Sequence, residues 1–260
     1  MIIENTSQYQ LYKHAAQISM EILRELYEMT KPGIFPVEID QKAFDLCKRH
    51  NVVSSFYGVP GAKSKYEYAS CISLNDEAVH GIPSSTRQIQ PGDLVKLDFG
   101  IISETYYTDH CVTVGIEKIK NKDYKLLEVG KQAVLDGVAQ AKTGKMTGDI
   151  GHAIESTARK SKFDTIKYYI GHGIGHHLHE DPEVPAAGRP NTGTVLKEGQ
   201  VICVEAQVVA GSPAISMDPD GWTVRTRDGK NAVMFEYMTI VRNGEPEILT
   251  DTRDWPLIRK

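Results

Sequence analysis

The stretch that decides the fold runs from Val95 to Asp109 and is VKLDFGIISETYYTD. Two apolar, strand-like segments end in Asp98 and Asp109, with polar residues between them. A hairpin centred between Ser103 and Glu104 pairs positions 98 and 109, which places both carboxylates on one face with Cβ atoms ~5 Å apart. Two carboxylates that close repel each other, and a bridging metal ion removes the repulsion. Taken alone, the hairpin equally fits two ordinary turn or edge residues.

A second segment, GHGIGHHLHEDP at residues 171–182, holds four of the nine histidines. Glycines flank His172 and let the backbone approach a ligand closely, so we expect this imidazole to face a metal. His179 lies seven residues further on and could face the same pocket. His176 and His177 are expected at the surface. The helical HExxH pattern is absent, which argues against that class of zinc protease.

Two further acids, Glu205 and Glu236, each interrupt an apolar strand pattern. Charges are rarely buried without a partner, and together with the two aspartates and His172 they form a consistent ligand set. An oxygen-rich site with one imidazole suits Mn, Fe or Co, with Zn also possible. It has too few thiolate or imidazole ligands for a structural zinc site. His80, before Gly-Ile-Pro, is by spacing alone a loop residue.

The order of predicted elements gives the fold class. Leu11 and the apolar residues that follow it at steps of three and four lie on one helical face. A first helix is therefore predicted, with Ser7 as its N-cap and its end at 31–33. A second helix follows Pro36, and residues 52–71 are irregular or form short strands. Strands are then predicted at 69–74, 93–99 and 106–114, helices at 122–140 and 149–161 with Asp149 as cap, and strands at 167–170, 200–209, 222–226 and 232–241. Two rounds of helices followed by strands predict one α+β domain, residues 1–260, built from two similar halves.

Composition narrows the function classes. The 260 residues are 40% hydrophobic and 25% charged, as in globular proteins. A net charge of −4 with scattered basic residues gives no nucleic-acid footprint and no polybasic membrane patch. The four cysteines have no CxxC spacing, and no apolar run reaches the length of a membrane span. The first residues lack the pattern of a signal peptide, so we expect a cytoplasmic protein.

These motifs together carry a family likeness along nearly the whole chain. The chain resembles the type I methionine aminopeptidases, which have the pita-bread fold: a curved antiparallel sheet flanked by helices, in two pseudo-symmetric halves. Only 26 residues separate His179 from Glu205, leaving no room for the insert of the type II branch. The matching motifs are Cys71-Ile72-Ser73-Leu74-Asn75, His80-Gly81-Ile82-Pro83, Leu97-Asp98, Asp109, Gly171 to Gly175, His179 to Pro182, Glu205, Asp220 to Val224, and Glu236.

The resemblance implies a centre of two divalent metal ions, with Co, Mn, Fe or Zn as candidates. Asp98 would chelate one ion, Asp109 and Glu236 would bridge both, and His172 and Glu205 would complete the coordination of the second. The family's chemistry is attack of a metal-activated hydroxide on the first peptide bond, which removes the initiator methionine of nascent polypeptides.

The same resemblance implies substrate contacts. Glu205 would also act as general base, His179 would stabilise the tetrahedral intermediate, and His80 would hydrogen-bond the scissile amide. Trp222 and Cys71 would contact the methionine side chain. The implied partner is a peptide or nascent-chain N-terminus, with ribosome association possible and a monomeric state expected.

The chain departs from the family pattern around the pocket. Ala206 stands where Pro is usual, Tyr237 where His is usual, and Val59 and Leu178 where aromatic residues are common, and the stretch before Cys71 is longer at 62–70. A paralogous aminopeptidase that prefers another N-terminal residue or a specialised peptide is therefore one alternative. A non-catalytic binding protein of the same fold is another, although it would be expected to lack ligands, and none is missing.

Overall fold

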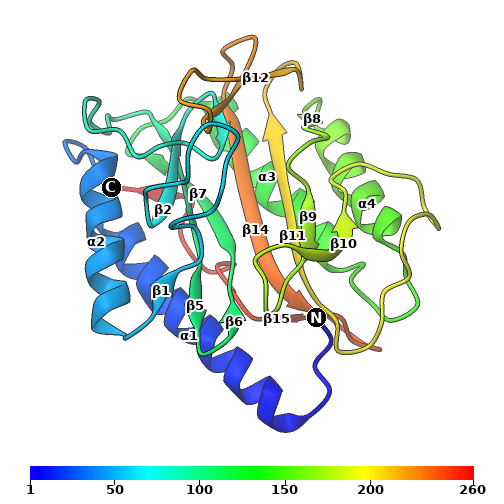
Figure 1. Cartoon of the computed structure of the whole chain (residues 1–260). Coiled ribbons are helices and arrows are strands. Elements are labelled where there is room, and N and C mark those ends of the chain that lie inside the picture. The colour runs from blue at the N-terminus through cyan, green and yellow to red at the C-terminus, as the bar shows by residue number, and fades with distance from the viewer.

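The computed structural model describes all 260 residues and has two successive rounds of helices and strands (Figure 1). The first round comprises α1 (Thr6–Met29), α2 (Pro36–Arg49), β1 (Val53–Ser54), β2 (Ser70–Leu74), β3 (Glu77–Val79), β4 (Leu94–Phe99), β5 (Ile101–Ser103), β6 (Tyr106–Tyr107) and β7 (His110–Ile116). The second comprises α3 (Asn121–Val138), α4 (Thr147–Lys160), β8 (Asp164–Thr165), β9 (Gly171–Gly173), β10 (Glu180–Val184), β11 (Val201–Val209), β12 (Ile215–Met217), β13 (Val224–Thr226), β14 (Ala232–Ile240), β15 (Glu247–Ile248) and β16 (Ile258–Arg259).

A ten-stranded sheet organises the molecule. Its main order is β10-β9-β11-β14-β7-β4-β2, with β8, β15 and β16 attached. Every pairing in it is antiparallel except that of β16 with β7. Helices α1 and α2 lie beside the first-round strands, and α3 and α4 lie behind β11 and β14 (Figure 1). The α+β pita-bread prediction is confirmed. None of the helices combines the length and the apolarity that a membrane crossing needs.

The alternating directions of the side chains along β11 and β14 place one set in the apolar core and the other in the site. Val204 and Ala206 on β11, and Phe235 and Tyr237 on β14, belong to the large apolar cluster that also contains the helix side chains. Successive side chains in a strand point to opposite faces. Glu205 and Glu236 therefore point away from the helices, toward the open face of the sheet.

Local boundaries differ from the sequence predictions in three places. Helix α1 is capped by Asn5, whose Oδ1 accepts the Gln8 N–H, rather than by Ser7, and Leu11 on its predicted apolar face is 44% exposed. Helix α4 begins at Thr147, so Asp149 lies within the first turn and accepts the Met146 N–H. Residues 167–170 form no strand, because Tyr169 has φ +56° and breaks the extended conformation.

The predicted register of the acidic hairpin was wrong by one residue per strand. Asp98 pairs with Cys111, not with Asp109. The turn residues are Glu104 and Thr105, with Glu104 at φ +56°, so the hairpin centre lies one residue later than predicted. Asp109 is two positions from Cys111 along the chain, and the two-residue period keeps it beside Asp98 on the same face.

Candidate metal centre

Four carboxylates from four places in the chain meet on the open face of the sheet. Asp98 lies on β4, Asp109 directly before β7, Glu205 on β11 and Glu236 on β14. Glu205 and Glu236 are direct cross-strand partners, and Cys111 pairs with both Asp98 and Glu236. Each carboxylate residue is less than a tenth exposed. The sheet register therefore brings together acids that are separated by up to 138 residues in the sequence.

Burial dominates the electrostatics of these acids. Burial raises the pKa of Asp98 to about 7 and the pKa of Glu205 to about 8. It also raises the pKa of Asp109 and of Glu236 well above the usual range, and the neighbouring carboxylates add to the effect. Without a cation, protons must neutralise part of this cluster. Four buried carboxylates with raised pKa values are the environment expected of a site that binds a cation.

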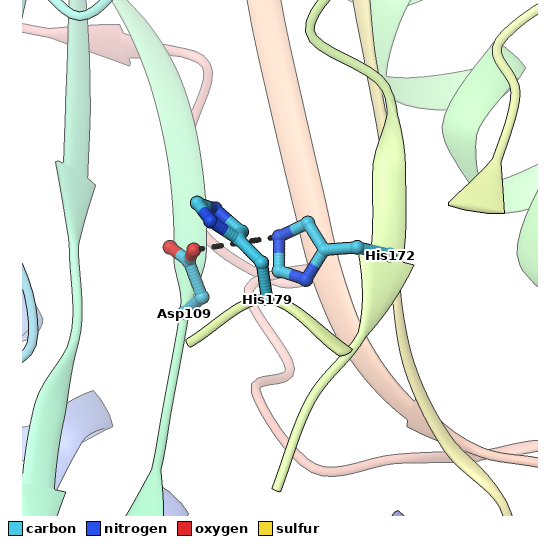
Figure 2. Close-up of side chains that lie close together, drawn as sticks. All are labelled: Asp109, His172 and His179. Carbon is cyan, nitrogen blue, oxygen red and sulfur yellow. Dashed lines mark ion pairs between the residues drawn. The ribbon is translucent and has the colours of Figure 1, made fainter. Parts of the chain in front are cut away.

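His172 completes the cluster from β9 (Figure 2). Its Nδ1 lies 2.9 Å from the Gly173 carbonyl oxygen, to which it donates, so Nε2 is left with a free lone pair. Nε2 lies 3.7 Å from Asp109 Oδ2 and 3.8 Å from Glu205 Oε1. Burial lowers the pKa of His172 to about 4, which keeps the imidazole neutral, the form that ligates metals.

The flanking glycines permit this position for a steric reason. A Cβ at Gly171 would lie 2.4 Å from the Cys203 carbonyl oxygen, and one at Gly173 would lie 2.1 Å from that of Asp181. Any larger residue would push β9 away from β11 or β10. The sequence predicted that these glycines let the backbone approach a ligand, whereas the structure shows them allowing close approach to the neighbouring strands.

The residues fit a divalent metal. Asp98 Oδ1, Asp109 Oδ1 and Glu236 Oε1 are buried and have no hydrogen-bond partner, which is costly unless a cation takes the lone pairs. Asp98, Asp109 and Glu236 offer ligand atoms that all lie within 4.8 Å of one another. Four carboxylates with one imidazole suit Mn, Fe, Co or Zn.

A cavity of about 760 Å³ opens above this floor, and its wall is apolar. Two expected substrate-contacting residues, Cys71 and Trp222, line it. Phe56 and Tyr66 join them, and the Tyr66 ring lies edge-on to Trp222 with centroids 4.9 Å apart. One cavity therefore combines an acidic floor with an apolar wall.

The two other histidines expected to contact substrate also line the cavity. His80 has φ +56°, a left-handed conformation that turns its ring onto Tyr169, with centroids 5.1 Å apart. His179 lies edge-on to His172 at 4.5 Å, next to Asp109 (Figure 2). Burial lowers the pKa of His80 to about 4 and also lowers that of His179, so both rings are neutral at pH 7. His176 and His177 are exposed, as expected.

Sequence reasoning missed three residues here. Tyr66, in the longer stretch at 62–70, is buried, and its hydroxyl donates to the Ser70 and Gly81 carbonyl oxygens. Gln207 Nε2 donates to Glu205 Oε2 at 3.1 Å and orients that carboxylate. Cys203, two residues before Glu205, has its thiol within 4.8 Å of ligand atoms of His172 and Glu236. The strand period of two was an available signal for Gln207 and Cys203.

The departures from the family pattern fall into two groups. Val59 and Leu178 line the cavity, as expected. Ala206 and Tyr237 lie in the apolar core on the helix side of the sheet, so their assignment to the pocket was wrong. Each follows an acid directly in sequence, and the alternation of the strand carries it to the opposite face.

Comparisons with known proteins agree with this fold and place the chain in a family. Residues 10–243 match the model of metallopeptidase family M24, and the chain belongs to this family of metal-dependent hydrolases. The chain is 35% identical over 250 residues to a methionine aminopeptidase of Clostridium acetobutylicum, covering 96% of this chain and 98% of that protein. A crystal structure of a methionine aminopeptidase from Thermotoga maritima superposes with a TM-score of 0.91 at 32% identity, covering 96% of this chain and all of that one. An Xaa-Pro dipeptidase from Bacillus anthracis, 22% identical with a TM-score of 0.77, shares the fold over 99% of this chain and 64% of its own.

Proposed function

We propose that the chain is a metalloaminopeptidase that removes the N-terminal methionine from nascent polypeptides. The observation that carries the proposal is a single cavity in which five buried side chains of types that ligate metals lie beneath an apolar wall. The floor suits hydrolysis and the wall suits an unbranched, apolar side chain such as methionine. The relatives named methionine aminopeptidase support the same substrate.

In this proposal the five floor residues hold two divalent metal ions. The ions would supply Lewis-acid chemistry, activating water and polarising the scissile carbonyl. The chain's own contribution begins with fixed geometry: Asp98 at one end, His172 and Glu205 at the other, and Asp109 and Glu236 between them. Because the strands fix these positions, little reorganisation is needed during the reaction.

Three side chains have proposed roles in the chemistry, and one of them is the floor residue Glu205. Glu205, oriented by Gln207, accepts the proton of the attacking water. His179, neutral and close to His172, donates a hydrogen bond to the developing oxyanion. His80, held against Tyr169, faces the scissile amide. Cys71, Trp222 and Tyr66 bound the side-chain pocket.

The proposal also covers the domain organisation, the oligomeric state and the place of action. We infer one catalytic domain, residues 1–260, that acts as a monomer in the cytoplasm on peptide or nascent-chain N-termini, with the ribosome exit as a place of action. The shared metallopeptidase family supports this inference.

The test is a panel of X-Ala-Ser peptides with metal-loaded protein. Release of methionine, with little release of other residues, is expected. An alternative, an aminopeptidase for another N-terminal residue, is favoured by Val59 and Leu178 in the cavity wall. Clear release of another residue without release of methionine would replace the proposal with that alternative.

A further inference from the structure

A thiol lies beside the carboxylate floor, on the same face of the sheet. Cys203 is two residues before Glu205 on β11, so both side chains point to the same face of the sheet. It is completely buried. Its Sγ donates to the Asp109 carbonyl oxygen, 3.9 Å away, and lies within 4.8 Å of a Glu236 carboxylate oxygen. Cys203 therefore lies next to two of the five proposed ligands.

The geometry around this thiol matches a three-ligand metal site. Ligand atoms of His172, Cys203 and Glu236 all lie within 4.8 Å of one another. The His172 Nε2 lone pair is free, because Nδ1 donates to the Gly173 carbonyl. Glu236 Oε1 is buried without a hydrogen-bond partner. An ion ~2.0–2.3 Å from each atom would draw the three side chains closer together.

Sulfur changes which metals such a site prefers. Thiolates favour soft or borderline ions such as Zn²⁺, whereas oxygen ligands suit Mn²⁺. The neighbouring thiol of Cys111 likewise donates to a backbone carbonyl oxygen, that of Met234 at 3.8 Å, but it does not belong to any group of clustered ligand atoms. Of these two thiols, only that of Cys203 lies close to both an imidazole and a carboxylate oxygen without a hydrogen-bond partner.

We propose that Cys203 is a metal ligand, and that with His172 and Glu236 it gives the centre a zinc-selective binding mode. The proposal rests on the metal centre of the proposed function. Metal coordination replaces the thiol proton, which leaves to solvent as the ion binds. The resulting sulfur, nitrogen and oxygen set is a common environment for zinc, and it holds Zn²⁺ more tightly than oxygen ligands with one imidazole would.

Cobalt absorption tests the proposal, since a thiolate ligand adds a near-ultraviolet charge-transfer band to the visible bands of bound Co²⁺. The metal-free protein is titrated with Co²⁺. The band is expected in the wild type and in the matched control Cys111→Ser, and is lost in Cys203→Ser. Zinc affinity should fall by about tenfold or more in Cys203→Ser, while Mn²⁺ affinity stays unchanged.

X-ray absorption of the zinc-loaded wild type gives a second readout that needs no variant. A sulfur neighbour at ~2.3 Å from zinc is expected. Bound cobalt without the charge-transfer band, or zinc without a sulfur neighbour, overturns the role of Cys203 and leaves the metal centre standing. Failure of the protein to bind either metal overturns both.

Discussion

The floor and the wall of the cavity are built in different ways. The floor residues come mainly from long, buried strands such as β11 and β14, whose register fixes each side chain. Much of the wall comes from connecting segments, including the stretch that supplies Tyr66 and the loop that supplies Leu178. Strand pairing leaves little freedom, whereas a connection can change length. The floor should therefore determine whether reaction occurs, and the wall which residue is removed.

The largest expected effect is on the floor. Asp109→Ala removes the carboxylate proposed to bridge the ions, so both metal binding and turnover should be lost. We expect turnover of Met-Ala-Ser to fall by at least ~10⁴-fold, as the loss of a central catalytic group does. Metal content by mass spectrometry and peptide release by chromatography measure the two effects. Asp45→Ala, exposed on α2, is the control, and unchanged metal content in Asp109→Ala would contradict the assignment.

Next in size is the loss of His179, at the boundary between floor and wall. His179→Ala removes the proposed donor to the oxyanion while leaving the carboxylates in place. The rate constant kcat should fall by ~10²–10³-fold with metal content retained. His176→Ala, an exposed histidine in the same loop, should remain close to wild type. A change confined to KM in His179→Ala would show that this residue only binds substrate.

The floor also shows how much of the site could be predicted from the sequence. The hairpin predicted Asp98 and Asp109, the flanking glycines predicted His172, and a lone acid in an apolar strand predicted the two glutamates. The structure brings all five together. The register of the hairpin was wrong, because a left-handed residue such as Glu104 leaves no clear signal. Asp109 nevertheless lies on the same face of the sheet as Asp98. The true partner of Asp98 is two positions after the predicted one, and a shift of two residues keeps a side chain on the same face.

The wall was much harder to predict. Tyr66 lies in a stretch whose path depends on packing against Trp222, and periodicity says nothing about such a segment. Val59 and Leu178 were predicted in the pocket through the resemblance alone. The same resemblance misplaced Ala206 and Tyr237, because closeness in sequence to a ligand does not mean closeness in space on a strand.

A smaller effect is expected from the wall. Tyr66→Ala opens the pocket beside Trp222, so the kcat/KM for Leu-Ala-Ser or Phe-Ala-Ser should rise relative to Met-Ala-Ser by ~10-fold. Tyr66→Phe keeps the ring and should preserve the preference of the wild type. Tyr57→Ala, whose side chain is exposed and lies outside the cavity, is the control. An unchanged ratio in Tyr66→Ala would remove Tyr66 from the determinants of specificity.

The last expected effect is on stability and not on turnover, and it concerns the anchor of β2, the strand that carries Cys71. Asp40 Oδ1 accepts hydrogen bonds from the Ser70 N–H and hydroxyl, both at 2.8 Å, and burial raises the pKa of Asp40 to about 6. Between pH ~4 and ~6 the folded state holds more protons than the unfolded state, so this carboxyl lowers stability as pH rises through that window.

Asp40→Asn keeps the acceptor oxygen and removes the charge. Its free energy of unfolding should exceed that of the wild type by up to ~3 kcal/mol at pH 8, with little difference near pH 4. Urea denaturation at the two pH values measures the effect, with Asp45→Asn as the exposed control on the same helix. Equal stabilisation at both pH values would contradict the role of the buried charge.

Anomalous diffraction at the metal absorption edge, on crystals of the metal-loaded and catalytically active protein, tests the central claim most directly. The account predicts two peaks ~3.5–4 Å apart, held by Asp98, Asp109, His172, Glu205 and Glu236. Crystals of active protein with no peak among these five side chains would contradict it.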